Sequence, residues 1–339
     1  MARPATGTLR AGLIGLGMMG RHHARVLRSS EGVELVAVAD PGGDPHGVAG
    51  ELEVLASVEA LIEVGIDMCV VAVPTRFHEP VALALAAAGV HTLVEKPLAS
   101  DIDAAKRIAA AFEDADLIGA VGHIERYNPA LQSLRARLRE GELGAVYQVA
   151  TRRQGPFPNR IADVGVVKDL ATHDIDLTAW VTGSEFRSVS ARTAYKSGRE
   201  HEDLVTAVGQ LADGTVTNHL VNWLSPMKER VTIVTGEKGA FVADTLTADL
   251  TFFANGTMPT AWDSIAKFRG VSEGDVVRFA IAKPEPLVTE HRAFADAVRA
   301  GDAGAADIVT MRQGLAVVAV AESMLRSADS GETVAVPQV

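Results

Sequence analysis

Asp169 and His173 are the first residues in this sequence whose types and spacing point to chemistry. They lie four positions apart in the segment DLATHDIDLTAWVTG, whose pattern predicts a helix, so the two side chains share one helical face. Histidine titrates near neutral pH and can accept a proton from a hydroxyl group, and an aspartate one turn away can orient its ring. Taken alone, the spacing favours a structural interpretation, in which an aspartate starts the helix and the histidine packs.

A glycine-rich turn, GLGMMG, carries a second chemical signal near the N-terminus. Gly15 ends the apolar run AGLIG, and Gly17 and Gly20 follow it. Their spacing lets the backbone turn tightly, approach a pyrophosphate and pack a helix against a strand. The segment RHHARVL at 21–27 is expected to form the helix that follows, and its N-terminus can hold phosphate through free amide groups. We assign Met18 and Met19 of the turn to the cofactor site. The sequence therefore predicts a dinucleotide-binding turn.

Asp40 adds to this prediction and bears on the choice of cofactor. It ends the strand-like run ELVAVAD, twenty residues after Gly20, where an acid accepts hydrogen bonds from the adenosine ribose. The next residues, PGGD, include no arginine to neutralise a 2′-phosphate, so we expect NAD rather than NADP. The alternative is an ordinary tight turn followed by a strand-ending acid, but the complete strand–turn–helix–strand–acid unit is far more specific.

The elements that must position these residues alternate along the first part of the chain. Apolar runs at 34–40, 68–75, 91–97 and 117–126 are separated by helical segments, which predicts a doubly wound parallel sheet. We assign residues 1–124 to this α/β Rossmann domain. Ligands of such sheets bind at the carboxyl ends of the strands. The residues that we accordingly assign to the cofactor site are Pro74, Thr75, His78, Glu95, Lys96 and His123.

From residue 125 onward the pattern is that of a different domain. An amphipathic helix at 127–141 and a strand at 146–153 precede the helix of His173, and several strand-like segments joined by turns follow. One of these turns is the Asp213–Gly214 hairpin signal. We therefore expect an α+β domain over 125–339, with a large, open, mostly antiparallel sheet. Its free face would pair copies of the chain into a homodimer or homotetramer.

Composition limits the classes of protein that this chain can be. Its 339 residues, 47% of them hydrophobic, are enough for two domains with cores. A formal charge of −11 argues against nucleic-acid and anionic-membrane partners. The single cysteine, Cys69, excludes an intrachain disulfide and is expected in a buried strand. No run of about 18 apolar residues and no signal core is present, so we expect a cytoplasmic protein, and we predict no metal site.

Three motifs together resemble the Gfo/Idh/MocA family, the glucose–fructose oxidoreductase and inositol dehydrogenase group. They are GLGMMG at 15–20, EKP at 95–97 and the D-x-x-x-H of Asp169 and His173, and the resemblance covers nearly the whole chain. GHIERYNPAL, DVGVVKDLATHDIDL and NWLSPMKERVTIVTGEKGAFVAD are similar to its branch of UDP-N-acetylglucosamine 3-dehydrogenases and related sugar-nucleotide dehydrogenases. The resemblance implies NAD or NADP as hydride acceptor, a Lys–Asp–His site, and dimers or tetramers formed through the second-domain sheet.

These motifs change the interpretation of the histidine, because a nicotinamide site lacks a proton acceptor of its own. Hydride leaves the carbinol carbon for the nicotinamide, and we assign the hydroxyl proton to His173 as general base. Lys96 would hydrogen-bond the same oxygen and polarise the forming carbonyl. Asp169 would orient His173 or contact a substrate hydroxyl.

The substrate contacts are assigned to polar residues near expected strand ends or within the branch-like motifs. Arginine suits a diphosphate because its paired donors match the oxygens. For each residue a structural or solvent contact is the alternative. Besides the catalytic residues, the set is Arg126, Asn128, Arg153, Lys168 and Asn222.

The residues predict an NAD-dependent dehydrogenase, and the family resemblance implies that it oxidises a sugar ring hydroxyl to a ketone. The resemblance to the branch implies that this hydroxyl is foremost the 3-hydroxyl of a UDP-N-acetylhexosamine. The first alternative is an inositol or simple aldose dehydrogenase of the same family. A second is an enzyme that oxidises and re-reduces its sugar without releasing NADH. A non-catalytic NAD-bound regulator is the alternative from another class, although a regulator need not retain the Lys–Asp–His set.

Overall fold

The structure is a computed structural model that describes residues 7–158, 164–256 and 273–339. The chain forms two units, one of Met1–Ile124, Glu285–Glu322 and Gln338–Val339, the other of Glu125–Pro284 and Ser323–Pro337. Residues 285–322 thus group with the first unit, whereas the sequence pattern predicts a second domain over 125–339. The physical reason is the apolar face of α8 (Pro286–Ala300), because Phe294, Ala297 and Val298 are buried in a core of the first unit.

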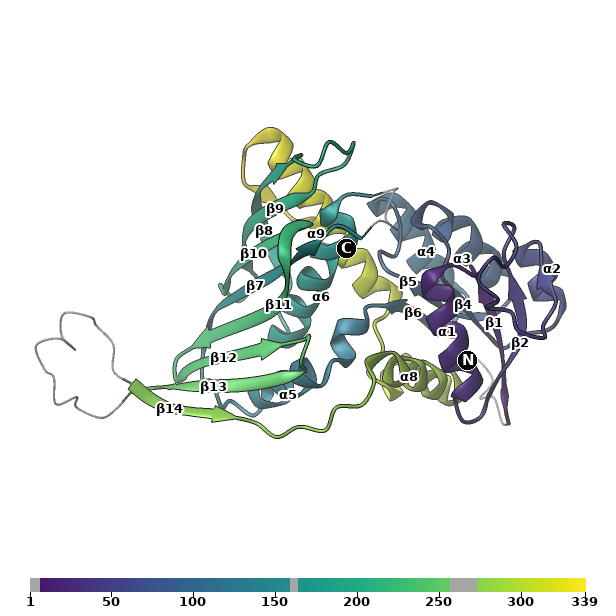
Figure 1. The fold of residues 1–339 in the computed structure, drawn as a ribbon, viewed down its shortest axis with the longest axis horizontal. Helices are drawn as coiled ribbons and strands as arrows, with labels where there is room; N and C mark the ends of the chain where they lie inside the picture. The colour runs from purple at the N-terminus through teal and green to yellow at the C-terminus, as the bar shows by residue number, and fades with distance from the viewer. Residues whose placement is uncertain (1–6, 159–163, 257–272) are drawn as a thin grey trace, which may run out of the picture. The chain divides into compact units, whose positions relative to one another are not determined.

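Within the described residues, the first unit contains a six-stranded parallel sheet in the order β3-β2-β1-β4-β5-β6 (Figure 1). The order reverses between β1 and β4, which is where such sheets bind their ligands. This confirms the predicted doubly wound sheet. Its elements are β1 (Leu9–Ile14), α1 (Met18–Ser29), β2 (Val33–Ala39), β3 (Val54–Leu55), α2 (Val58–Glu63), β4 (Met68–Val71), η1 (Thr75–Phe77), α3 (His78–Ala87), β5 (His91–Glu95), α4 (Ile102–Asp114) and β6 (Gly119–Gly122).

The buried positions of these strands are mostly apolar on both sides because both faces of the sheet are covered, whereas Arg10 and Glu34 near the strand starts are exposed. Along β4, Met68 and Val70 belong to one hydrophobic core, and Cys69 and Val71 belong to the other. All four side chains are fully buried. Burial raises the pKa of the Cys69 thiol far above its ordinary value, so this cysteine is an inert apolar residue, as its position in the strand predicts.

The described part of the second unit contains a nine-stranded sheet in the order β14-β13-β12-β11-β7-β10-β9-β8-β15 (Figure 1). β7 and β10 pair in parallel, and the other neighbours pair antiparallel, which confirms the mostly antiparallel sheet. The strands are β7 (Val146–Pro156), β8 (Phe186–Ala194), β9 (Leu204–Leu211), β10 (Val216–Asn222), β11 (Leu224–Gly236), β12 (Gly239–Asp244), β13 (Asp249–Asn255), β14 (Glu273–Arg278) and β15 (Val334–Ala335).

Helices cover one face of this sheet. Leu131 and Leu134 of α5 (Pro129–Arg139) and Leu177 of α6 (Thr172–Thr182) pack with Val149 and Phe241 of the strands. The other described helical segments of the chain are η2 (Ile124–Tyr127), η3 (Val167–Ala171), η4 (Ala303–Ala305) and α9 (Met311–Ser330). In the part of the chain that the structure describes, no helix has both the length and the apolar character needed to cross a bilayer.

The opposite face of the sheet presents an alternating set of side chains. The register places Val276, Phe253, Gln148, Val216 and Gln210 in one row across the strands. The apolar members of the row are exposed by 42–59%. This side of the sheet, which we call the open face, therefore carries exposed apolar side chains on β14, β13 and β10.

His219 lies in the covered face and makes the stability of this unit depend on pH. Its Nδ1 is 2.8 Å from Oγ1 of Thr151, and burial lowers its pKa to about 4. The unfolded chain protonates its histidines near pH ~6.5. Between these two values the unfolded state binds more protons than the folded state, so stability is lost as the pH falls from about 6.5 to about 4.

We expect the His219→Gln variant to flatten this pH dependence by up to about 3 kcal/mol, the free energy that corresponds to the difference between the two pKa values. Urea unfolding at stepped pH, followed by tryptophan fluorescence, measures it, because Trp180 and Trp223 belong to this unit. The exposed histidine His22 offers a control, and His22→Gln should keep the wild-type slope. Parallel curves for His219→Gln and the wild type would contradict the assignment.

Candidate active site

The glycine-rich turn between β1 and α1 combines tight packing with open space. Gly15 has a φ of +94°, which favours glycine, and a Cβ there would lie 2.5 Å from the carbonyl oxygen of Ala72. A Cβ on Gly20 would lie 1.9 Å from the carbonyl oxygen of Gly15. At Gly17, by contrast, a Cβ would meet no atom of the described residues within 4 Å. The turn is therefore closed against the sheet and open in front of Gly17.

The first amide groups of α1, like those of any helix, have no acceptor within the helix and need hydrogen-bond partners from outside it. Gly17 is the N-cap, and no side chain among the described residues caps it. The first helical bond runs from the amide of Arg21 to the carbonyl of Gly17, at 3.0 Å. The earlier amides, those of Met18 and Met19 included, thus suit a pyrophosphate group, and the residues present fit a dinucleotide.

Asp40 joins this turn to the end of β2. Its Oδ2 accepts a hydrogen bond from the amide of Leu16 at 2.8 Å, and its Oδ1 accepts one from Gly42 at 2.8 Å. A carboxylate oxygen has a second lone pair, so both oxygens can still accept from ribose hydroxyls. The acid predicted for the adenosine ribose therefore also fixes the glycine-rich turn.

Glu95, at the end of β5, is directed into the first unit. Its Oε1 is 2.8 Å from Nε2 of His23, and its Oε2 accepts from the amide of Lys96 at 3.1 Å. Nδ1 of His23 is in turn 2.8 Å from Nε2 of His291. Burial alone would raise the pKa of Glu95, but the contacts with His23 and Lys96 outweigh it, and the pKa lies below its ordinary value. Glu95 is thus an anion that links the segment of Lys96 to α1 and, through His23, to His291 of α8.

The other predicted cofactor residues lie at the strand ends of the same sheet. His78 is buried, with Nδ1 2.9 Å from the carbonyl of Pro97 and Nε2 3.0 Å from that of Val73, so it links the ends of β4 and β5. The Lys96–Pro97 peptide is cis. Pro74 and Thr75 begin η1 after β4, and His123 follows β6 and is buried.

In the second unit, Lys168 and Asp169 lie in η3, a π-helical turn that continues directly into α6. The sequence predicts one uninterrupted helix here, so the π-turn is a difference, and such turns are frequent at functional sites. Asp169 is 4% exposed. His173 is half-buried, whereas its neighbours Thr172 and Asp174 are buried. His173 is therefore the side chain of this first turn of α6 that reaches the surface of the unit.

A buried group of charges adjoins this helix. Nε of Arg153 is 2.8 Å from Oδ1 of Asp174, and its Nη1 is 2.7 Å from Oε1 of Glu125. Burial lowers the pKa of Arg153, but the two carboxylates more than offset this and hold it above its ordinary value. Burial and repulsion by Arg153 lower the pKa of Arg230, and the charges of Asp174, Glu125 and, least, Asp169 counter part of this shift. Asp169 thus lies within electrostatic reach of a cation.

The remaining predicted substrate residues make structural contacts within the second unit. Arg126 is buried in a bidentate pair with Asp176, at 2.8 and 2.6 Å. Asn128 caps α5 through the amide of Ala130, at 3.0 Å. Asn222 donates to Oε1 of Gln154 at 3.0 Å. The acidic partners Asp174 and Asp176 follow His173 in the sequence, but nothing in their spacing indicates which arginines they hold.

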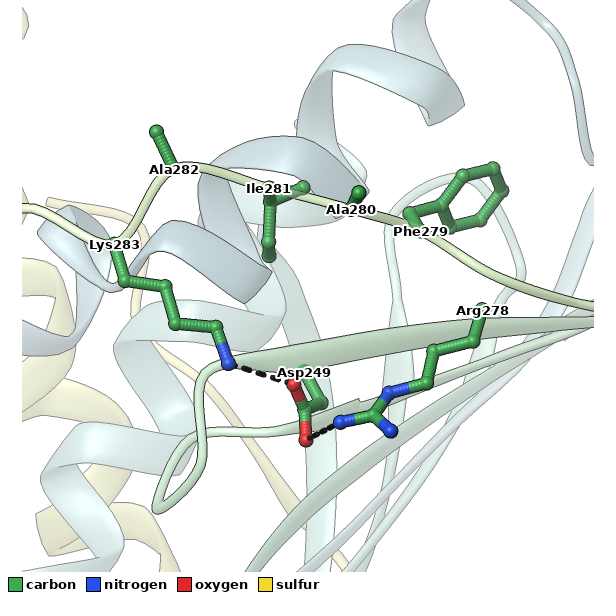
Figure 2. Close-up of a pocket in the computed structure, with 7 residues that line it drawn as sticks. All are labelled: Asp249, Arg278, Phe279, Ala280, Ile281, Ala282 and Lys283. Carbon is green, nitrogen blue, oxygen red and sulfur yellow. Dashed lines mark hydrogen bonds and ion pairs between the residues drawn. The ribbon is translucent and has the colours of Figure 1, made fainter.

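A surface cavity of about 540 Å³ in the second unit contains none of these residues (Figure 2). As Figure 2 shows, Lys283 and Arg278 approach Asp249 from two sides, each at 2.7 Å. Hydrogen bonds from Lys283 and then Arg278 lower the pKa of Asp249 below its ordinary value. The backbone between the two cations completes the lining with Phe279, Ala280, Ile281 and Ala282.

Comparisons with known proteins agree with this arrangement. A family model described as an oxidoreductase family with an NAD-binding Rossmann fold matches residues 9–123, and the GFO/IDH/MocA C-terminal domain matches residues 131–242. A UDP-N-acetylglucosamine 3-dehydrogenase from Acidithiobacillus ferrooxidans is 36% identical over 62% of this chain and 66% of its own length. A scyllo-inositol 2-dehydrogenase (NAD(+)) from Bacillus subtilis (strain 168) is 32% identical over 54% and 56%, respectively.

The chain thus covers less than two-thirds of either relative in these matches. A solved structure extends the likeness to nearly the full length. It is UDP-N-acetylglucosamine 3-dehydrogenase GnnA from Acidithiobacillus ferrooxidans, with a TM-score of 0.82 and 28% identity over 95% of this chain and 98% of that one. These findings confirm the family and the cofactor that the sequence predicts. The chain belongs to the Gfo/Idh/MocA family of oxidoreductases, and its cofactor is NAD.

Proposed function

We propose that this protein is a dehydrogenase that oxidises the 3-hydroxyl of a UDP-N-acetylhexosamine to a ketone. The observation that carries the proposal is the half-buried imidazole of His173, one turn after the buried carboxylate of Asp169, in a chain that also holds an NAD-binding turn. The likeness to UDP-N-acetylglucosamine 3-dehydrogenases supports the substrate class. We also propose a cytoplasmic location, because NAD is an intracellular cofactor.

The residues divide the work of the reaction between them. NAD supplies a hydride acceptor at C4 of its nicotinamide ring. His173 accepts the hydroxyl proton on its imidazole, and Asp169 orients the ring and stabilises its charged form. Lys96 donates a hydrogen bond to the reacting oxygen and stabilises the negative charge that develops there. Asp40 favours NAD over NADP, because a 2′-phosphate would meet its carboxylate.

Substrate contacts are proposed first for Lys168, which is half-buried in the turn that carries Asp169. Asn222 is buried at the end of β10, and one of its amide hydrogens is used by Gln154. The ion pairs of Arg126 and Arg153 favour the structural alternative for these two residues, since their guanidinium groups already neutralise buried carboxylates.

This last observation also favours a second candidate, an inositol or simple aldose dehydrogenase. A polyol or free sugar carries no diphosphate and needs no arginine to bind it. The similarity to an inositol dehydrogenase agrees with this alternative.

The test is NADH formation, followed by its absorbance. Purified protein and NAD are mixed in turn with UDP-N-acetylglucosamine, N-acetylglucosamine, myo-inositol and glucose, each with and without 2-oxoglutarate. NADH formed only with the UDP-sugar supports the proposed substrate. A signal with inositol or glucose selects the second candidate. If no NADH accumulates, mass spectrometry of the sugars distinguishes an oxidation–reduction cycle from the absence of reaction.

We further propose that the open face pairs copies of the chain into a homo-oligomer. Val208, Val216, Phe253 and Val276 are each exposed by more than 40% on this face. Exposed apolar side chains grouped in this way mark association surfaces.

We expect the double variant Val208→Glu/Phe253→Glu to be monomeric, because carboxylates facing each other across a symmetric interface lose hydration and repel. Light scattering coupled to gel filtration gives the mass. The control is Val64→Glu, which changes an apolar residue of the first unit that is 39% exposed, and it should keep the wild-type mass. A wild-type protein that is monomeric at micromolar concentration would contradict the proposal.

A further inference from the structure

Glu202 is a buried carboxylate for which neither the cofactor nor the proposed chemistry provides a role. It lies between β8 and β9 and is 6% exposed. Its Oε1 accepts a hydrogen bond from the amide of Val167 at 3.0 Å, and its carbonyl oxygen accepts one from Val166 at 2.9 Å. Both amides belong to the start of η3, the turn that carries Lys168 and Asp169. One residue thus satisfies two backbone groups at the beginning of the candidate catalytic helix.

The Glu202 carboxylate occupies the space that a side chain at position 165 would need. A Cβ on Gly165 would lie 2.0 Å from Oε2 of Glu202 and 2.1 Å from its Oε1 and Cδ. The φ of Gly165 is outside the left-handed region, so space and not backbone conformation requires glycine here. Gly165 is itself part of the turn, because its carbonyl accepts the amide of Asp169 at 3.0 Å.

The segment that presents Glu202 is held in place by its neighbour. Oδ2 of Asp203 accepts from the amides of Lys196 and Ser197 at 2.7 and 2.6 Å. The carbonyl of Asp203 accepts from the amide of Trp223 at 2.9 Å. The carboxylate of Glu202 therefore projects from a fixed support. Its negative charge at a helix start is favourable, because the helix dipole and a charge-assisted hydrogen bond act in the same direction.

We propose that Glu202 is a positioning residue of this enzyme. By capping η3 and filling the space beside Gly165, it fixes the turn of Lys168 and Asp169 and thereby the direction of His173. The inference rests on the proposed function, because it assumes that Asp169 and His173 act in the reaction. Glu202 itself does not contact the reacting atoms in this proposal.

The first test compares two substitutions of this residue. Glu202→Ala removes the acceptor, and Glu202→Gln keeps an acceptor of the same size. We expect Glu202→Ala to lower kcat about 10- to 100-fold, the effect of a small misplacement of catalytic groups, whereas Glu202→Gln stays within about threefold of wild type because its amide oxygen still caps. NAD affinity should be unchanged in both variants, since the NAD-binding turn belongs to the first unit. A loss of folded protein would instead lower both quantities together.

The second test uses Gly165→Ala, alone and combined with Glu202→Ala. The new methyl group has room only if the carboxylate leaves, so Gly165→Ala alone should reproduce the loss of kcat seen in Glu202→Ala. In the double variant the methyl group meets no carboxylate, so kcat should equal that of Glu202→Ala. Such strong non-additivity is the signature of two residues that act through one contact.

Hydrogen–deuterium exchange of the peptide that contains Val167 gives a measurement independent of activity. Exchange should be faster in Glu202→Ala and unchanged in Glu202→Gln. Unchanged exchange in Glu202→Ala overturns the capping role, whatever the substrate proves to be. Faster exchange with wild-type kcat overturns the positioning role. Losses in kcat that add in the double variant, or an equal loss in Glu202→Gln and Glu202→Ala, overturn it as well. Full turnover by His173→Ala would refute the role of His173 as general base, which this inference assumes, and would leave the exchange result standing.

Discussion

Replacing His173 with alanine is expected to lower kcat about 100- to 10,000-fold, the range that a general base contributes. The variant keeps the glycine-rich turn, which belongs to the first unit, so its affinity for NAD should stay within about twofold of wild type. The ring of His173 is only half-buried, whereas Leu177 and Trp180 of α6 belong to a hydrophobic core, so removing the ring leaves the apolar side chains of this core in place. Steady-state NADH formation and a fluorescence titration with NAD measure the two quantities.

The matched control is His46→Ala, which removes an exposed histidine of the first unit and should leave kcat unchanged. Melting temperatures of the variants exclude unfolding as the cause of a loss. If His173→Ala keeps more than a tenth of the wild-type turnover, the proton goes to another group. Lys96, which shares the reacting oxygen in the proposed mechanism, would then be the first residue to test.

The sequence predicts those parts of the site whose residues lie close together in the chain. GLGMMG needs glycine at positions where neighbouring backbone atoms leave no room, and the packing of Gly20 on Gly15 involves residues five positions apart. The pairing of Asp169 and His173 likewise follows from helical periodicity. Such local constraints leave a recognisable spacing because the elements that cause them are adjacent in the chain.

The parts that the sequence does not predict depend on distant residues. His23 meets Glu95 and His291, which are 72 and 268 positions away, and nothing near any of the three indicates the contact. The π-turn at Asp169 is capped by Glu202, which lies 35 positions after Val167. The local sequence cannot predict this turn, because its first amides donate hydrogen bonds to Glu202, which lies in the distant connection between β8 and β9. The same holds for α8, because its apolar face could pack against the core of either unit, and the local sequence does not distinguish the two.

The arginines illustrate a different difficulty, because one residue type serves two purposes. A guanidinium group binds a diphosphate or a carboxylate with the same donors. Arg126 and Arg153 are each held by carboxylates of the α6 segment. The aspartates DID, which follow His173, could not be assigned to these arginines from the sequence, because the partners come from β7 and from the segment before α5.

Gly20→Ala is expected to abolish NAD binding, with the dissociation constant raised at least about 100-fold. The new Cβ would lie 1.9 Å from the carbonyl oxygen of Gly15, and no rotamer relieves a clash between a Cβ and the backbone. The turn must therefore open, which moves the amides of α1 away from the pyrophosphate. Losing two charge-assisted hydrogen bonds of about 1.5–3 kcal/mol each accounts for that factor. The affinity is measured by calorimetric titration with NAD.

The Gly17→Ala variant distinguishes a clash within the protein from a clash with the bound pyrophosphate. Its Cβ would meet no described atom within 4 Å, so the melting temperature without NAD should stay at the wild-type value, whereas Gly20→Ala should lower it. NAD affinity should nevertheless fall in Gly17→Ala, because the methyl group enters the space expected for the pyrophosphate. Native affinity in Gly17→Ala would place the pyrophosphate elsewhere. Native affinity in Gly20→Ala would mean that the contact between Gly20 and Gly15 does not hold the turn in its binding conformation.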